Sequence, residues 1–124
     1  MENYFHSNSQ NAAANTDFRR VVYTSEHIQV VLMSVIAGEE IGEEVHDEHD
    51  QTFLIVSGEG KVTVGAEKIA AHAGDVIVIP MGVYHNVKSL GPGDLKLYSL
   101  CAPPHHPRNA VHPTKAAAAS AQEH

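Results

Sequence analysis

The 124 residues of the chain, 43% of them hydrophobic, suffice for one domain with a single core and not for two. The formal net charge of -7 argues against a nucleic-acid or anionic-membrane partner, because either would need a surplus of Lys and Arg on one face. The lone cysteine, Cys101, excludes an internal disulfide and is predicted to be a small buried side chain, not a nucleophile.

The N-terminal segment, residues 1–17, is rich in Asn, Ser and Ala and lacks an apolar period, which predicts a flexible arm. It has neither the cationic start nor the apolar stretch of a signal peptide. No apolar run in the chain approaches the ~20 residues of a membrane span. We therefore expect a cytoplasmic protein.

From Arg19 onward, short β-branched and aromatic runs alternate with Gly, Pro, Asp or Asn, which is typical of strands and turns. Nothing before Pro103 has the period of a helix. Residues 18–102 are therefore predicted to form an all-β domain, either a sandwich or a barrel. The expected strands are 19–24, 28–37, 44–45, 52–57, 61–64, 67–71, 76–79, 85–89 and 95–101.

Two polar clusters have fixed internal spacing. The first consists of Gly38, Glu44, His46, Gln51 and Gly58. The second consists of Gly74, Pro80, Gly82 and His85. This double pattern resembles the two motifs of the cupin superfamily, G-x5-H-x-H-x(3,4)-E-x6-G and G-x5-P-x-G-x2-H-x3-N, with the spacings kept. The resemblance covers roughly residues 28–100 and implies a double-stranded β-helix, or jelly-roll barrel. More narrowly, the chain resembles small single-domain cupins of the mannose-6-phosphate isomerase-like group.

The chain also departs from the family pattern. The two histidines of the first motif fall on Glu44 and His46, its glutamate on Gln51, and the histidine of the second motif on His85, while Ser89 replaces the closing asparagine. The resemblance implies a metal held by one carboxylate, two imidazoles and one amide oxygen. Glu44 and His46 are two residues apart, so on a strand they face the same side. Such a mixed set suits Zn, Fe, Mn, Ni or Co and does not choose among them.

His49 is the rival ligand, because a bulge between His46 and Gln51 could turn it inward. Its acidic neighbours favour an exposed loop position instead. The neighbouring carboxylates, predicted to form a solvated rim, are Asp47, Glu48 and Asp50.

The C-terminal tail, residues 103–124, begins with two prolines, His105, His106 and a third proline, and it ends in an alanine run too short to be a stable helix alone. The prolines predict a stiff, extended segment after the last strand. This segment could place His105 or His106 over the metal as a proton donor or acceptor, contact a partner subunit, or lie on the surface.

Two functions fit these features. The first is a metal-dependent enzyme of the isomerase or dioxygenase type, acting on a small polar metabolite, in which Glu44 or a metal-bound water moves a proton. The second is a non-catalytic module that binds a sugar-like ligand. The lack of a Lys or Arg cluster in residues 18–102 argues against a phosphorylated ligand. A jelly roll leaves open edge strands, so we expect a homodimer, with residues 19–24 as an exchange element.

Overall fold

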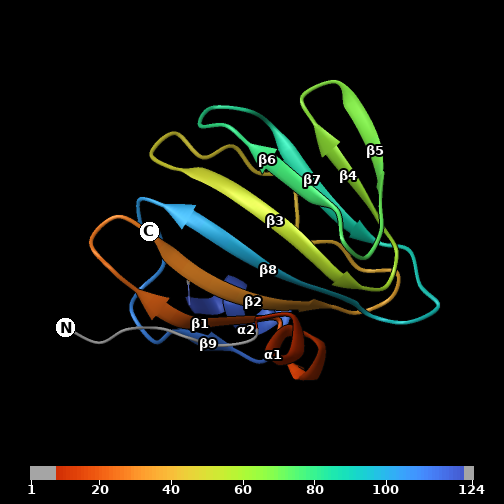
Figure 1. Ribbon diagram of the computed structural model, residues 1–124, viewed down its shortest axis with the longest axis horizontal. Coiled ribbons are helices and arrows are strands. Elements are labelled where there is room, and N and C mark those ends of the chain that lie inside the picture. The colour runs from red at the N-terminus through yellow and green to blue at the C-terminus, as the bar shows by residue number, and fades with distance from the viewer. Residues whose placement is uncertain (1–7, 122–124) are drawn as a thin grey trace.

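The computed structural model describes residues 8–121 (Figure 1). In chain order its elements are α1 (Asn8–Ala14), β1 (Arg19–Thr24), β2 (Gln29–Val35), β3 (Asp50–Ser57), β4 (Gly60–Val64), β5 (Glu67–Ala71), β6 (Val76–Ile79), β7 (His85–Ser89), β8 (Leu95–Ala102), β9 (Val111–His112) and α2 (Lys115–Ala121). Strands thus dominate the described residues, which confirms the all-β prediction.

The strands form two antiparallel sheets. The larger has the order β6-β3-β8-β2-β1-β9, and the smaller has the order β5-β4-β7. Figure 1 shows the smaller sheet beside β6 and β3. The apolar core is built from both sheets, with Phe53, Leu97 and Val31 from the larger and Val62 and Val87 from the smaller. This arrangement confirms the expected jelly roll.

Residue alternation in β3 and β8 shows which face of the larger sheet meets the core. In both strands every second residue is buried, because successive side chains point to opposite faces. The buried series of β8, which includes Leu95 and Leu97, faces the core, while the intervening positions face outward. In β2 all seven residues are buried, so both of its faces are covered.

The prediction that no helix precedes Pro103 is wrong, because residues 8–14 form α1. This helix contacts β8, β2 and β3, and its Ala12 is fully buried. Lys96 on β8 donates one hydrogen bond to the carbonyl of Asn15 at 2.6 Å and another to Ser34 Oγ at 2.8 Å. Tertiary packing therefore stabilises a helix too short to form alone. Of the expected flexible arm, residues 1–7 lie outside the described residues, and α1 holds residues 8–14 against the larger sheet.

Gly58, the last residue of the first motif, allows the turn after β3 to approach the residue that precedes β8. Its φ is +86°, and a Cβ added here would lie 2.5 Å from the carbonyl oxygen of Asp94. Any other residue would strain the backbone and clash with Asp94. The motif glycine therefore serves the turn that joins β3 to β4.

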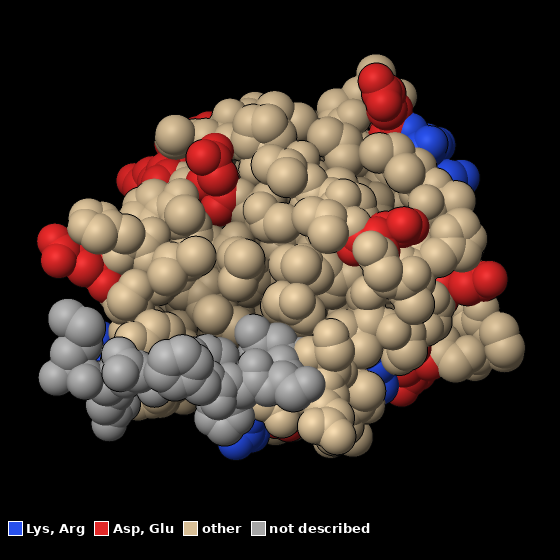
Figure 2. Space-filling view, in the orientation of Figure 1, with Lys and Arg blue, Asp and Glu red and all other residues tan. Residues whose placement is uncertain are grey.

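The outer face of the larger sheet carries little charge. Figure 2 shows the side on which β3, β8 and β2 cross the view, with acidic side chains toward its rim. Val76 and Val78 of the edge strand β6 are each 58% exposed. None of the helices within residues 8–121 is long and apolar enough to span a membrane.

Candidate metal centre

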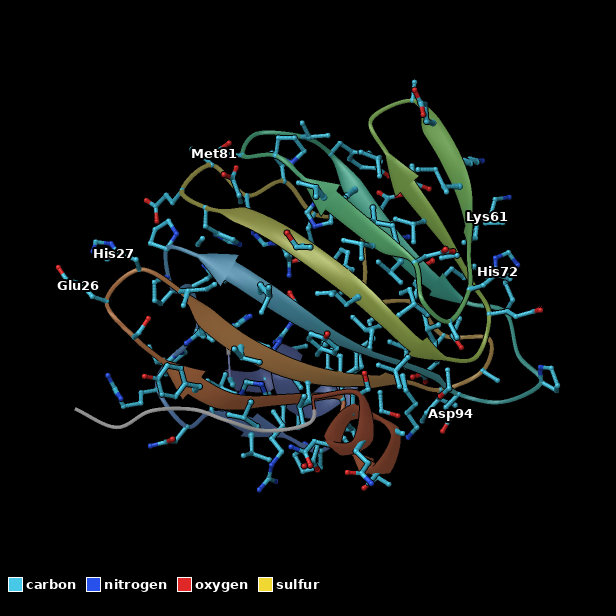
Figure 3. All side chains as sticks on the ribbon, in the orientation of Figure 1. Glu26, His27, Lys61, His72, Met81 and Asp94 are labelled. Carbon is cyan, nitrogen blue, oxygen red and sulfur yellow. The ribbon has the colours of Figure 1, made fainter. Side chains whose placement is uncertain are left out.

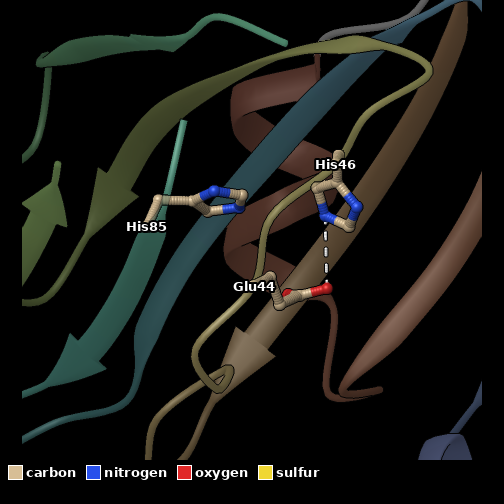
Figure 4. Close-up of side chains that lie close together, drawn as sticks. All are labelled: Glu44, His46 and His85. Atoms are coloured by element: carbon tan, nitrogen blue, oxygen red, sulfur yellow. Dashed lines mark ion pairs between the residues drawn. The ribbon is translucent and has the colours of Figure 1, made fainter. Parts of the chain in front are cut away.

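Three side chains with metal-binding groups converge between two segments of the barrel (Figure 4). Glu44 and His46 lie on the connection from β2 to β3, and His85 is the first residue of β7. The backbones of Glu44 and His85 pair through two hydrogen bonds of 2.9 Å, which fixes the connection against β7. One ligand atom from each of the three residues lies within 4.8 Å of the other two. The three groups can therefore hold one metal ion together.

The imidazole of His85 is oriented by its backbone. Its Nδ1 donates to the carbonyl oxygen of Val83 at 3.1 Å, which leaves Nε2 as the acceptor atom. This Nε2 is buried and has no hydrogen-bond partner among residues 8–121. A metal-ligating histidine has this arrangement, in which one ring nitrogen is fixed by a carbonyl and the other faces the ion.

Gln51 on β3 is oriented in a similar way. Its Nε2 donates to Ser99 Oγ at 3.0 Å, and Ser99 is fully buried on the neighbouring strand β8. Its Oε1 is buried and lacks a partner in the described part of the chain. A buried carbonyl oxygen without a partner is costly, so the arrangement suits an oxygen ligand for a cation. The residues present thus fit a metal ion.

The electrostatics of the three converging groups favour a cation. Burial alone would raise the pKa of Glu44, but the hydrogen bond and charge of His46, whose Nε2 lies 3.2 Å from Glu44 Oε2, lower the pKa below its usual value. The charges of His85 and Arg19 add to this lowering. Burial lowers the pKa of His85, opposed by its bond to Val83 and by Glu44. At neutral pH the site thus offers a carboxylate and a neutral imidazole, the forms that bind metals.

The prediction that His49 lies exposed in a loop is wrong. Only 2% of His49 is exposed, and its Nε2 is buried without a partner within residues 8–121. The ring centroids of His46 and His49 lie 4.3 Å apart. Burial, followed by the charges of His46 and His105, lowers the pKa of His49 to about 4. His49 is therefore neutral at pH 7 and lies beside the three converging groups.

The segment 103–107, which we call the strap, contacts this cluster. The ring of His105 stacks on His49 with centroids 4.4 Å apart and lies 5.1 Å from the ring of His46. The rings of His105 and His106 meet edge to face, with centroids 4.8 Å apart. Burial, followed by the charges of Arg19 and His105, lowers the pKa of His106 to about 3. The sequence left open whether this part of the tail lies over the site, against a partner subunit or on the surface. The structure shows the strap at the site.

A pocket of about 220 Å³ opens at the cluster. Its lining consists of Val45, His46, Asp47, Glu48, His49 and His105. Asp47, Glu48 and Asp50 are exposed, as the rim prediction states. A larger pocket of about 610 Å³ lies beside α1 and β1, but no histidine lines it. We therefore take the smaller pocket as the entrance to the site.

Two further histidines and the cysteine are not among the candidate ligands. Figure 3 shows His27 and His72 at separate edges of the molecule, and both are exposed. Cys101 is fully buried, which confirms that it is a small buried side chain, and this burial raises the pKa of its thiol to about 11.

Three residues near the site were missed from the sequence. Ser99 orients Gln51, Arg19 contributes to the lowered pKa of Glu44, and Gln29 holds the strap. The signal for Gln29 is visible in the sequence, because a glutamine inside the apolar run 28–37 needs buried partners. The partners themselves lie far away along the chain.

The fold and this cluster define a barrel protein with a His and Glu group able to bind metal. Residues 31–101 match the family model described as a cupin domain, so the chain belongs to the cupin family. The crystal structure of BH2720 from Bacillus halodurans superposes with a TM-score of 0.94 and 38% identity, covering 96% of this chain and 95% of that one.

Two curated relatives match most of this chain. The uncharacterized protein YrkC of Bacillus subtilis is 43% identical over 115 residues, which are 88% of this chain and 62% of the relative. The uncharacterized protein L612 of Acanthamoeba polyphaga mimivirus is 39% identical over 101 residues, which are 78% of this chain and 63% of the relative. The chain thus spans somewhat over six tenths of the length of these relatives.

Proposed function

We propose that this cupin is a metal-dependent enzyme acting on a small polar metabolite, with isomerase-type or dioxygenase-type chemistry. The proposal rests on the convergence of Glu44, His46 and His85, whose ligand atoms lie within 4.8 Å of one another. The buried, unpartnered Oε1 of Gln51 supports it as the fourth ligand. The resemblance to the mannose-6-phosphate isomerase-like group is part of this proposal.

The ligand set is one carboxylate, two imidazoles and one amide oxygen. This set suits Zn, Fe, Mn, Ni or Co, and it leaves an octahedral ion two positions for water or substrate. His49 is a candidate fifth ligand, because its buried Nε2 lies on a ring that contacts His46. When bound, the ion supplies Lewis-acid polarisation of a substrate oxygen, or oxygen chemistry if it is Fe(II).

Glu44 and His105 are the proposed proton-transfer residues. Glu44 is an ionised carboxylate at neutral pH, and the His105 ring lines the pocket entrance. The pKa of His106, lowered to about 3, keeps its ring neutral, so His106 supports the strap and does not donate a proton. The acidic rim of Asp47 and Glu48 favours a neutral or cationic substrate over a phosphorylated one.

The alternative is a non-catalytic module for a sugar-like ligand. The pocket lining favours it, because imidazole and carboxylate groups surround a space of about 220 Å³ and can hydrogen-bond several hydroxyls. The two functions differ in whether a bound ligand exchanges protons.

Proton exchange into bound ligand separates the two functions. Metal-loaded protein is incubated in D2O with a panel of small aldoses and hydroxyketones, and deuterium incorporation is followed by NMR. The isomerase-type enzyme predicts incorporation that is lost in Glu44→Gln even when this variant is loaded with metal, because the carboxylate that moves the proton is gone. Ligand-induced shifts of protein resonances with neither deuterium incorporation nor O2 consumption would favour the binding module.

A homodimer and a cytoplasmic location complete the proposal. The exposed Val76 and Val78 on a sheet face with little charge favour a second copy as the partner, because two chains of net charge -7 can meet most easily where few charges lie. β1 pairs with β2 and β9 of its own chain, so strand exchange is not needed. Light scattering should give a dimeric mass that Val78→Lys reduces; a monomeric mass for the unchanged protein contradicts the dimer.

The single buried Cys101, which forms no internal disulfide, is compatible with the cytoplasm.

A further inference from the structure

Gln29 connects the barrel to the strap. It is the first residue of β2 and is fully buried, although its neighbours in the strand are apolar. A buried side-chain amide is tolerated only when its donors and acceptor are satisfied. The identity of its partners therefore shows what this residue does.

Every hydrogen-bonding atom of the Gln29 amide is in use. Its Oε1 accepts from the backbone N–H of His105 at 3.1 Å and from that of His106 at 2.9 Å. Its Nε2 donates to the carbonyl of His106 at 2.8 Å and to Thr24 Oγ1 at 2.9 Å. Three of these four bonds reach the strap, which lies 76 to 77 residues away in sequence. Gln29 thus fixes the backbone of two successive residues at once.

The fixed backbone determines where the His105 ring lies. The ring stacks on His49 at 4.4 Å, with an interplanar angle of 29°, and lies 5.1 Å from His46. It also lines the entrance pocket. A shift of the strap would therefore move this imidazole off the side of the cluster that faces the pocket.

We propose that Gln29 is a positioning residue, which clamps the strap so that His105 closes the pocket side of the metal centre. The clamp controls how fast the ion leaves and how a small ligand reaches it. This inference rests on the proposed function, which supplies the metal. The hydrogen bonds of the Gln29 amide to the strap do not depend on any ion.

The test measures the rate of metal release. The full chain is loaded with Co²⁺, excess EDTA is added, and the visible absorption of bound Co²⁺ is followed with time. Gln29→Met, which keeps the volume and removes the hydrogen bonds, should release Co²⁺ several-fold faster than the unchanged protein, because the strap no longer holds the His105 ring on the pocket side of the cluster. His105→Ala should give a similar increase.

Non-additivity distinguishes positioning from general loosening. The double variant Gln29→Met/His105→Ala should release Co²⁺ no faster than the faster single variant, because Gln29 acts through the strap. Rates that multiply in the double variant would show that Gln29 acts by another route and would overturn the inference.

Asn15→Leu is the matched control. Asn15 is also a buried side-chain amide, and it holds Asp17 in the turn between α1 and β1 through two hydrogen bonds of 2.8 and 3.2 Å. Its loss should lower the melting temperature without changing the release rate by more than about twofold. A comparable acceleration in Asn15→Leu would mean that lost stability alone opens the site.

Two measurements keep the inference decidable if Gln29→Met does not fold. The first is His105→Ala, whose partly exposed position tolerates truncation. The second is hydrogen exchange of the unchanged protein, in which the amides of His105 and His106 should be protected together. Unprotected amides, or equal release rates with Co²⁺ bound, overturn the clamp. A chain that binds no Co²⁺ at all contradicts the proposed function instead, whatever the exchange shows.

Discussion

Replacing His49 with Gln should make the metal-free protein less sensitive to acid. In the folded chain, burial and the charges of neighbouring histidines lower the pKa of His49 from 6.5 to about 4. The unfolded chain therefore binds more protons than the folded chain between pH 6.5 and 4, so the free energy of unfolding falls as the pH falls through this range.

The magnitude follows from the two pKa values. A shift from 6.5 to about 4 corresponds to about 3 kcal/mol over the full range, because one pKa unit is worth about 1.4 kcal/mol. Between pH 8 and pH 5 the part lost is about 2 kcal/mol. Gln cannot titrate, so this part is absent from the variant.

Urea unfolding of both proteins at pH 8 and pH 5, in the presence of EDTA, measures the effect. The difference in unfolding free energy between the two pH values should be about 2 kcal/mol smaller in His49→Gln than in the unchanged protein. Equal differences in the two proteins would show that His49 is not buried in its neutral form, and the description of the cluster would then be wrong.

Three further predictions concern other parts of the molecule. Gly58→Ala should lower the free energy of unfolding by at least about 2 kcal/mol, because φ is +86° and the added Cβ meets a carbonyl oxygen at 2.5 Å. Gly74→Ala, with open space around its Cβ, should lower it by about 1 kcal/mol. Equal losses for the two variants in denaturant titrations would contradict this reasoning. Ser99→Ala should lower the metal affinity about tenfold at unchanged stoichiometry, because Gln51 loses the hydrogen bond that orients it. Calorimetric titration measures this affinity, and an unchanged value would remove Gln51 from the ligand set. Cys101, with its thiol pKa raised to about 11 and no exposed surface, should react with a thiol reagent at pH 8 only after unfolding, and rapid reaction in the folded protein would count against its burial.

The strands were predictable because their signals are local. The bounds of 19–24, 67–71, 76–79 and 85–89 agree with the structure, since apolar alternation and turn residues lie within a few positions of each other. α1 was missed because a seven-residue helix of Asn, Ser, Gln and Ala has no apolar period, and its stability comes from packing on β8 and β2.

In the candidate site, too, features with a local signal were predictable and features that depend on distant contacts were not. The resemblance to the two cupin motifs selected Glu44, His46 and His85, and the structure brings their ligand atoms within 4.8 Å of one another. The burial of His49 was not predictable, because it depends on the ring of His105, which lies beyond the last long strand. Because His49 lies between two acidic residues, the sequence predicts an exposed position for it unless this distant contact is known. The role of each ligand stays a prediction.

The most direct test of the central claim is the metal content of His85→Ala beside that of His72→Ala. His72 is an exposed histidine whose Nδ1 lies 3.6 Å from Asp75 Oδ2, and neither residue belongs to the cluster, so its loss removes an imidazole without touching the site. Elemental analysis of untagged protein should find about one transition metal per chain in the unchanged protein and in His72→Ala, and little in His85→Ala. Equal metal content in the two variants, or no metal after reconstitution of the unchanged protein, would contradict a metal centre built on Glu44, His46 and His85.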